Sequence, residues 1–267
     1  MRISTVAAIL FTFFLLKVSG QTDTVFNQID DKGLKQGYWK KFHPNGKLMY
    51  KGLFKDNTPV GEMRRYYDSG ALKAVLFFSK DGKSAKVMVF YEDGEKSAEG
   101  KYYENLKDST WNYYSYYSGS LVNEEYYDKG KKTGVQKNYY HNGQIAEEIE
   151  YKNGIKSGTW KQYFEDGQIK LKSSHSFNMV NGRYEFYYPD GTLMMVGVFT
   201  DNKRHGPWTY YTEEGDVKYK IRYEFGQVHA EDQKILDAES EEFFKKVDEN
   251  IGKFEEPTID DFFGRPQ

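Results

Sequence analysis

The 267-residue chain contains no cysteine. This absence excludes disulfide bridges, thiolate metal ligands and a lipid attached through a cysteine. The folded protein must therefore be held together by side-chain packing and backbone hydrogen bonds alone.

Motifs for catalysis and cofactor binding are also missing. The chain has no G-x-S-x-G and no H-E-x-x-H, and Asp81-Gly82-Lys83-Ser84 lacks the upstream glycine of a phosphate-binding loop. Adjacent glutamates at 124–125, 147–148 and 213–214 would point to opposite faces of a strand, where we expect them to be solvated. We therefore expect no catalytic, cofactor-binding or metal-binding residues, and no enzyme.

The chain carries little net charge, −2 in total. Residues 21–225 hold 31 basic against 28 acidic residues, which is far from the basic stripe of a nucleic-acid-binding protein. Residues 226–267 hold 5 basic against 12 acidic residues and are therefore an acidic tail.

Only one long apolar run exists, over residues 6–16. It follows Arg2 and precedes the small residues Ser19 and Gly20, which is the pattern of a secretory signal peptide over residues 1–20. The run is about half of the roughly 20 residues that a membrane-spanning helix needs. We expect export to the periplasm, cell envelope or outside of the cell, with no transmembrane span after cleavage; a retained anchor is the alternative.

Aromatic residues are abundant, with 24 Tyr and 18% aromatic residues in all. Such rings suit pleated, half-exposed surfaces, so a sheet-rich protein is the first inference. Proline is scarce, and Pro44, Pro59 and Pro189 lie at expected turns while Pro207 starts an expected strand.

Glycine recurs at a step of 24 residues, with one step of 25. The repeated glycines are Gly46, Gly70, Gly94, Gly119, Gly143, Gly167, Gly191 and Gly215. Asn or Asp often precedes this glycine, and such pairs populate the positive φ values of a tight hairpin turn. The residues after it alternate between apolar and polar, as in Leu193, Met195, Gly197 and Phe199.

The period predicts about eight tandem β-hairpins of 24 residues. The expected fold is all-β, an elongated single-layer antiparallel meander roughly 75 Å long at about 4.8 Å per strand. The segments 128–134 and 152–158 read as polar loops between hairpins. We expect irregular pairing where the alternation breaks, at Lys96 and at Ser173 and His175.

Two sets of aromatic residues recur in the strand before each turn. We expect one set to be structural sheet-packing residues, namely Trp39, Trp111, Trp160 and Trp208. An aromatic pair before the turn would place one ring on each face. The second set, at or beside that pair, is a possible binding surface: Tyr67, Tyr91, Tyr116, Tyr140, Phe164 and Tyr188.

The string Gly-x-Trp-x-x-Tyr-Phe/Tyr-x-x-Gly-x-Leu/Ile, followed by Tyr-x-x-Gly-x-x-x-Gly, runs through residues 134–158 and again from Gly158, with departures such as Gln136 for the tryptophan. It resembles the bacterial variant of the MORN repeat over about 70% of the chain. The resemblance implies a row of hairpins that serves as an interaction or scaffold module without chemistry of its own. Bacterial relatives are often labelled antitoxins of toxin-antitoxin systems.

The Trp, Tyr-Tyr and Gly spacing is also similar to the choline-binding and glucan-binding repeats of bacterial surface proteins, in which rings form cages for ammonium groups or sugars. The 24-residue step and the long alternating second strand fit the MORN type better. A carbohydrate- or wall-binding role follows from this second resemblance.

The period stops after Tyr223, and residues 230–253 are charged and helix-forming. Leu236, Phe243, Val247 and Ile251 would share one helical face. We expect this helix to cap the last hairpin, because a terminal sheet edge is a liability unless it is covered. The alternative is that the helix, or residues 254–263 with the Phe262-Phe263 pair, binds in the groove of the array or on a partner.

These patterns divide the chain into a signal peptide (1–20), a lead-in (21–36), the MORN-type array (37–225) and the acidic helical tail (226–267). Our first hypothesis is an exported, non-catalytic interaction or scaffold protein. The alternatives are a surface carbohydrate- or cell-wall-binding repeat protein and an antitoxin or immunity-like inhibitor. The expected partner is another protein, a glycan or a lipid headgroup, and not nucleic acid.

Overall fold

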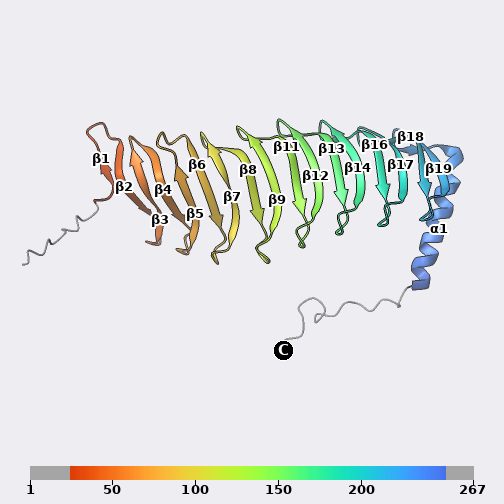
Figure 1. Ribbon diagram of the computed structural model, residues 1–267, viewed down its shortest axis with the longest axis horizontal. Helices are drawn as coiled ribbons and strands as arrows, with labels where there is room; N and C mark the ends of the chain where they lie inside the picture. Colours follow the sequence, from red (N-terminus) through yellow and green to blue (C-terminus); the bar gives the residue numbers. More distant parts are fainter. Residues whose placement is uncertain (1–24, 251–267) are drawn as a thin grey trace, which may run out of the picture.

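The computed structural model describes residues 25–250. They form one open antiparallel sheet of 20 strands, paired in chain order, and an α-helix that follows the sheet. Figure 1 shows a long row of hairpins with the helix at its C-terminal end. The predicted all-β, single-layer antiparallel meander is confirmed. The predicted signal peptide and residues 251–267 lie outside the described residues.

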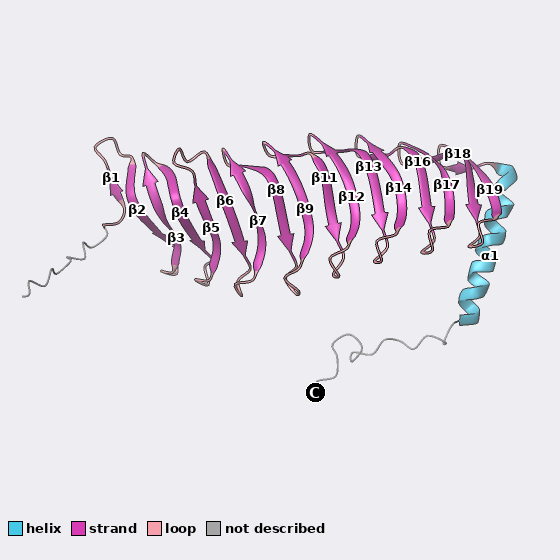
Figure 2. Cartoon of the chain, in the orientation of Figure 1, coloured by secondary structure: helices cyan, strands magenta, loops and turns pink. Residues whose placement is uncertain are grey.

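Eight hairpins make up the row (Figure 2). The first four pair β2 (Lys35–Phe42) with β3 (Leu48–Lys55), β4 (Thr58–Tyr66) with β5 (Leu72–Phe78), β6 (Ser84–Phe90) with β7 (Lys96–Tyr103), and β8 (Leu106–Tyr114) with β9 (Leu121–Asp128). The last four pair β11 (Gly134–Tyr139) with β12 (Ile145–Lys152), β13 (Ile155–Tyr163) with β14 (Ile169–Ser176), β16 (Gly182–Tyr187) with β17 (Leu193–Thr200), and β18 (Lys203–Tyr211) with β19 (Val217–Glu224). The short strands are β1 (Gln28–Ile29), β10 (Lys131–Lys132), β15 (Met179–Val180) and β20 (Gln227–Val228).

The turn inside each hairpin is longer than the tight turn that the Asn-Gly and Asp-Gly pairs predicted. In the fifth hairpin Gly143 N–H donates to Tyr140 C=O (3.0 Å) and Tyr140 N–H to Gln144 C=O (2.8 Å). Only the glycine takes a positive φ, 84° at Gly143, while the side chain of Asn142 accepts the N–H of Gln144 at 2.9 Å. The expectation that both residues of the pair adopt positive φ is therefore wrong, because the Asn acts as a side-chain acceptor instead.

The two-residue turns with two positive φ values lie between the hairpins. Asp56 and Asn57 have φ of 49° and 66°, and Asp201 and Asn202 repeat these values. Such turns match the twist of the flanking strands. The polar loops predicted at 128–134 and 152–158 are correspondingly shorter, because strand pairing resumes directly after the turns.

Each hairpin contains a register shift just before its turn, as between Gln162 and Tyr163. The shift beside Lys96 is the same as in the other hairpins and is not a local response to the lysine. At Ser173 and His175 the pairing of β14 is interrupted on the side of β15 and β16, but similar breaks lie between most neighbouring hairpins, so this one is also not a local response to those residues. Regular bulges increase the twist of a sheet, which suits a single layer that must bury its own side chains.

The two faces of the sheet differ in chemistry. We call one the aromatic face; its central row, crossing the strands in order, includes Trp39, Gly52, Met63, Leu76, Val87, Gly100, Trp111, Ile149, Trp160, Tyr184, Gly197, Trp208 and Ile221. We call the other the charged face; its central row includes Lys40, Lys51, Arg64, Glu124, Lys137, Glu148, Lys161, Lys172 and Glu185.

Two tryptophans of the aromatic face are almost fully buried. Trp208 is 0% and Trp111 is 2% exposed. Each indole lies over a glycine of the preceding strand, where an added Cβ would come within 2.2 Å of Trp208 at Gly197 and 2.4 Å of Trp111 at Gly100. Each indole N–H also donates to a backbone carbonyl of that strand. The space left by the absent side chain of each glycine is therefore filled by a tryptophan of the next hairpin.

The C-terminal edge is covered by a 3-10 turn (Ala230–Asp232) and α1 (Gln233–Asn250). Ile235 and Leu236 pack against Trp208, Ile221 and Tyr223 of the last hairpin. These contacts agree with the capping role predicted for the helix. The side chains of Phe243 and Val247, and all of Ile251, lie outside what the structure describes.

Side-chain oxygens accept an edge N–H at both ends of the sheet. Asp232 accepts the backbone N–H of Arg222 in β19 at 2.8 Å and also binds its guanidinium at 2.9 Å. Asn27 Oδ1 accepts the backbone N–H of Lys40 in β2 at 2.8 Å. Both edge strands therefore lose a free donor for pairing with another chain.

Gly197→Ala tests the contact between neighbouring hairpins. A methyl group pressed against Trp208 should cost about 1–3 kcal/mol of stability, measured by urea unfolding. In a Trp208→Leu background the same change should cost less, because the indole is gone. Equal costs in both backgrounds would contradict the contact.

Asp232→Asn tests the cap. Hydrogen bonds from Arg222 lower the pKa of Asp232 to about 2. Because this folded-state value lies below the ordinary one, the carboxylate stabilises the fold above about pH 4, and the contribution is lost as the pH falls towards 2. The wild type should therefore be more stable than the variant at pH 7, and the difference should shrink between pH 4 and pH 2. Asp237→Asn, which changes an acid that bonds only Gln233 within the described helix, serves as control.

Candidate interaction surface

Most of the aromatic residues predicted to bind a ligand are used inside the array. The hydroxyls of four tyrosines each donate to a backbone carbonyl 23 residues ahead, in the next hairpin, at 2.7–3.0 Å. The four pairs are Tyr67 with Phe90, Tyr91 with Tyr114, Tyr140 with Tyr163, and Tyr188 with Tyr211. His43 Nε2 lies 3.1 Å from the Tyr66 carbonyl at the same repeat position. These half-buried side chains form one row of ties along the hairpin turns, and a binding role for them stays a prediction.

The other two predicted residues differ from this row. Phe164 holds the same position without a hydroxyl and is half-buried. Tyr116 is displaced by the extra residue of the fourth hairpin and is 51% exposed, beside Tyr117 at 94%. The structure therefore places the six residues along one edge, one per hairpin, and brings the rings of Tyr91 and Tyr116 into edge-to-face contact at 5.0 Å.

The middle of the aromatic face is polar. Glu125 is 9% exposed, accepts a hydrogen bond from Tyr127 at 2.6 Å and pairs with Lys132. Burial alone would raise the pKa of Glu125, but hydrogen bonds from Lys132, Tyr127 and Tyr113 outweigh it and hold the pKa below its ordinary value. The expectation that Glu124 and Glu125 are both solvated is wrong for Glu125. The expectation that they point to opposite faces holds.

This polar stretch continues to Glu147 in the next hairpins. Glu147 accepts hydrogen bonds from the Trp160 indole (2.8 Å), Gln162 (3.0 Å) and Asn138 (2.8 Å). His175 lies beside Trp160, and burial lowers its pKa. Glu147 is thus held by its own and the next hairpin, whereas Nδ1 of His175 is buried without a hydrogen-bond partner.

The charged face of the middle hairpins alternates in sign from Glu124 to Lys161, and Lys161 then lies opposite a second lysine, Lys172. Lys137 pairs across the sheet with Glu124 on one side, at 3.6 Å, and with Glu148 on the other. Glu148 is opposite Lys161, and Lys172 is opposite Glu185. Opposite charges in such pairs stabilise a sheet by roughly 0.2–1 kcal/mol each.

The first two hairpins break this alternation. Lys51 lies opposite Lys40 on one side and opposite Arg64 on the other. Three cations therefore occupy directly facing positions on three consecutive strands. Like charges in facing positions are destabilising. Lys161 and Lys172 also face each other, but each has a glutamate on its other side, whereas Lys51 has a cation on both sides.

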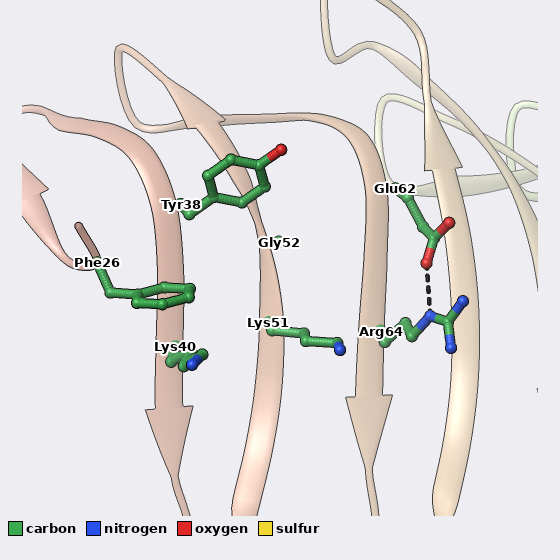
Figure 3. A pocket seen from close by; sticks show the side chains of 7 residues that line it. All are labelled: Phe26, Tyr38, Lys40, Lys51, Gly52, Glu62 and Arg64. Carbon is green, nitrogen blue, oxygen red and sulfur yellow. Dashed lines mark hydrogen bonds and ion pairs between the residues drawn. The ribbon is translucent and has the colours of Figure 1, made fainter. Parts of the chain in front are cut away.

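The row lines a hollow that we call the N-terminal groove, formed by Phe26, Tyr38, Lys40, Lys51, Gly52, Glu62 and Arg64, with a volume of about 470 Å³. Figure 3 shows Lys51 extending towards the strand of Arg64, while the Arg64 guanidinium points away from Lys51 and is joined to Glu62; the rings of Tyr38 and Phe26 lie near the strand of Lys40. Tyr38 is 53% exposed, and Lys40 Nζ lies 3.5 Å from the centre of the Phe26 ring.

Glu62 is the one acid of the groove. Its carboxylate lies 2.5 Å from Nε of Arg64 and raises the pKa of that guanidinium. Sequence reasoning missed the groove because Lys40 and Lys51 become neighbours only when the register shift before the turn is counted. Two lysines in strands that flank one turn are the signal that was available.

No group of three or more His, Cys, Asp or Glu residues between 25 and 250 could hold a metal ion. Within the same part of the chain no helix is both long and apolar enough to span a membrane.

Comparison with protein families gives five matches to the family described as MORN repeat variant, at residues 35–56, 132–153, 156–176, 180–201 and 204–231. The chain is a MORN-repeat protein of this variant type. Hairpins two to four, between residues 57 and 131, lie outside these matches although they pair as the others do. The antitoxin label does not follow from the match.

Likeness to solved structures is limited. TarM aligns with 18% identity and a TM-score of 0.27, over 35% of this chain and 20% of TarM. A GtfA/B complex bound to UDP and GlcNAc aligns with 18% identity and a TM-score of 0.19, over 48% of this chain and 24% of that one. The chain thus spans a quarter or less of the length of these proteins, and scores this low support no functional argument. A comparison with curated proteins finds no significant match.

The row of tyrosine ties can be tested at equivalent positions. Tyr140→Phe removes one hydrogen bond to the next hairpin and should lower stability by about 0.5–1.5 kcal/mol. Phe164→Tyr makes the reciprocal change where the hydroxyl is naturally missing and should raise stability. Urea unfolding measures both, and a neutral result for both would show that the row contributes nothing.

Proposed function

We propose that this MORN-repeat protein is an exported, non-catalytic interaction module that holds another protein against the charged face of its array. The observation that carries the proposal is the difference between the two faces. The aromatic face is filled by its own rings and polar network, whereas the charged face presents accessible ionic side chains on most hairpins. Repeated at about 10 Å per hairpin, such groups suit an extended partner surface.

The positions of the tyrosines favour a protein partner over a glycan. A sugar-binding site stacks its ligand on ring faces and can use tyrosine hydroxyls as additional hydrogen-bond partners. Here the hydroxyls of Tyr67, Tyr91, Tyr140 and Tyr188 already bind the next hairpin.

Export is supported by the N-terminal sequence. Residues 6–16 form an apolar run of signal-peptide length, and Ser19 and Gly20 offer a cleavage position. A chain without cysteine also needs no disulfide chemistry to mature outside the cytoplasm.

Cell fractionation combined with cross-linked capture tests the proposal. The mature protein should be recovered from the envelope or medium with a new N-terminus near Gln21. It should retain a partner protein that salt releases. Charge reversal of Lys161 and Lys172 on the charged face should reduce capture at least several-fold, while the same change at Lys129 and Lys152, beside the turns between hairpins, should not.

Several outcomes count against the proposal. Recovery of the protein only from the cytoplasm, with residues 1–20 intact, would contradict the proposed export. Equal loss in the two pairs of variants would remove the charged face as the binding surface. Sugar binding that is lost in Tyr140→Ala and Tyr188→Ala would favour the carbohydrate-binding alternative.

A further inference from the structure

We propose that the N-terminal groove binds a dianionic phosphoryl group, with Lys51 and Arg64 as its principal ligands. The inference rests on the proposed function in using the same charged face, and it names the chemistry recognised at one end of that face. It starts from the one place between residues 25 and 250 where three like-charged residues face each other on consecutive strands.

The row is costly when nothing is bound. Neighbouring strands lie about 4.8 Å apart, so the backbones of Lys40, Lys51 and Arg64 lie within about 10 Å of one another. Equivalent rows of the middle hairpins place an acid between the bases, as Glu148 lies between Lys137 and Lys161. An anion in the groove would supply the negative charge that the sheet omits here.

The charge of the groove suits a dianion. Three cations against Glu62 leave a net charge of +2. A phosphate monoester carries a charge of about −1.5 to −2 at pH 7 and offers three strong acceptor oxygens. A carboxylate would neutralise only half of the groove.

Glu62 prepares the guanidinium for this role. It engages Nε of Arg64 at 2.5 Å, and this is the only contact that the described residues make with the side-chain nitrogens of Arg64. The Nη edge is then available for a bidentate contact, which planar guanidinium groups make well with phosphate. Figure 3 shows the Lys51 ammonium reaching the strand of Arg64 while the guanidinium points away from it, so a phosphoryl group that contacts both requires the exposed Arg64 side chain to turn towards Lys51.

The remaining wall is aromatic and is held by the N-terminal cap. Asn27 binds the backbone of Lys40, which brings Phe26 against the Lys40 ammonium. The exposed ring of Tyr38 stands next to it. The groove therefore has a cationic floor and an aromatic side, and its 470 Å³ exceed what a phosphoryl group alone would fill. A phosphate ester with a flat or apolar body fits this combination.

Isothermal titration calorimetry with phenyl phosphate tests the proposal. The wild-type protein should bind it more tightly than benzoate, and binding should weaken with salt and as the pH falls from 7 to 5, because the ester loses its second charge. Lys51→Gln and Arg64→Gln should each weaken binding about tenfold or more, the scale of a lost charge-assisted hydrogen bond. Lys220→Gln is the matched control, because Lys220 holds the repeat position of Lys51 in the last hairpin and lies opposite Thr209.

Two further arms identify the source of the phosphoryl group. Flotation with phosphatidic acid vesicles, compared with phosphatidylcholine vesicles, reports a lipid source, and titration with inorganic phosphate reports a soluble one. Binding in either arm that depends on Lys51 and Arg64 supports the site. No binding in any arm, or equal loss in Lys220→Gln, overturns it. Circular dichroism confirms that each variant is folded.

The same variants separate this inference from the proposed function. Partner capture without phosphoryl binding would overturn the groove alone. Phosphoryl binding without partner capture would overturn the protein-interaction role alone.

Discussion

The fold depends on the contact between each hairpin and the next, because a single-layer sheet has no second layer to bury its rings. That contact takes two forms. Trp111 and Trp208 fill the space above Gly100 and Gly197 on the aromatic face. At the turn edge, the tyrosine hydroxyls bind carbonyl groups 23 residues ahead. Stability in such an array is close to a sum of nearest-neighbour terms.

The same constraint explains why the two faces of the sheet carry different kinds of side chain. Rings must face inward along the twisted sheet, and the opposite side is left to polar and charged residues. The alternating row around Lys137 and Glu148 is a solvated surface that contributes modestly to stability. The row around Lys51 lacks these stabilising pairs of opposite charge. Residues that depart from the arrangement that stabilises the fold are expected at functional sites.

The repeat could be predicted from the sequence because a glycine recurs at the same position of every hairpin. A glycine with positive φ is needed at the same turn of every hairpin, so a step of 24 residues predicted both the element and its number. The geometry of the turn could not be predicted, because Asn142 serves equally well as a left-handed residue or as a side-chain acceptor. Glu125 was misjudged for a related reason: its burial depends on Lys132 and Tyr127 in neighbouring strands, which one unit does not reveal. The groove was missed because cross-strand register decides which lysines meet.

The ends of the array carry a consequence for its size. With Asn27 on one edge N–H and Asp232 on the other, neither terminal strand offers an unbroken ladder to a further hairpin. Arrays of this kind can in principle grow by adding copies edge to edge. Here the number of hairpins in the chain fixes the length instead, at about 75 Å for 16 long strands. The protein is therefore an array of fixed length, with a cationic groove near its first strands and a helix after its last.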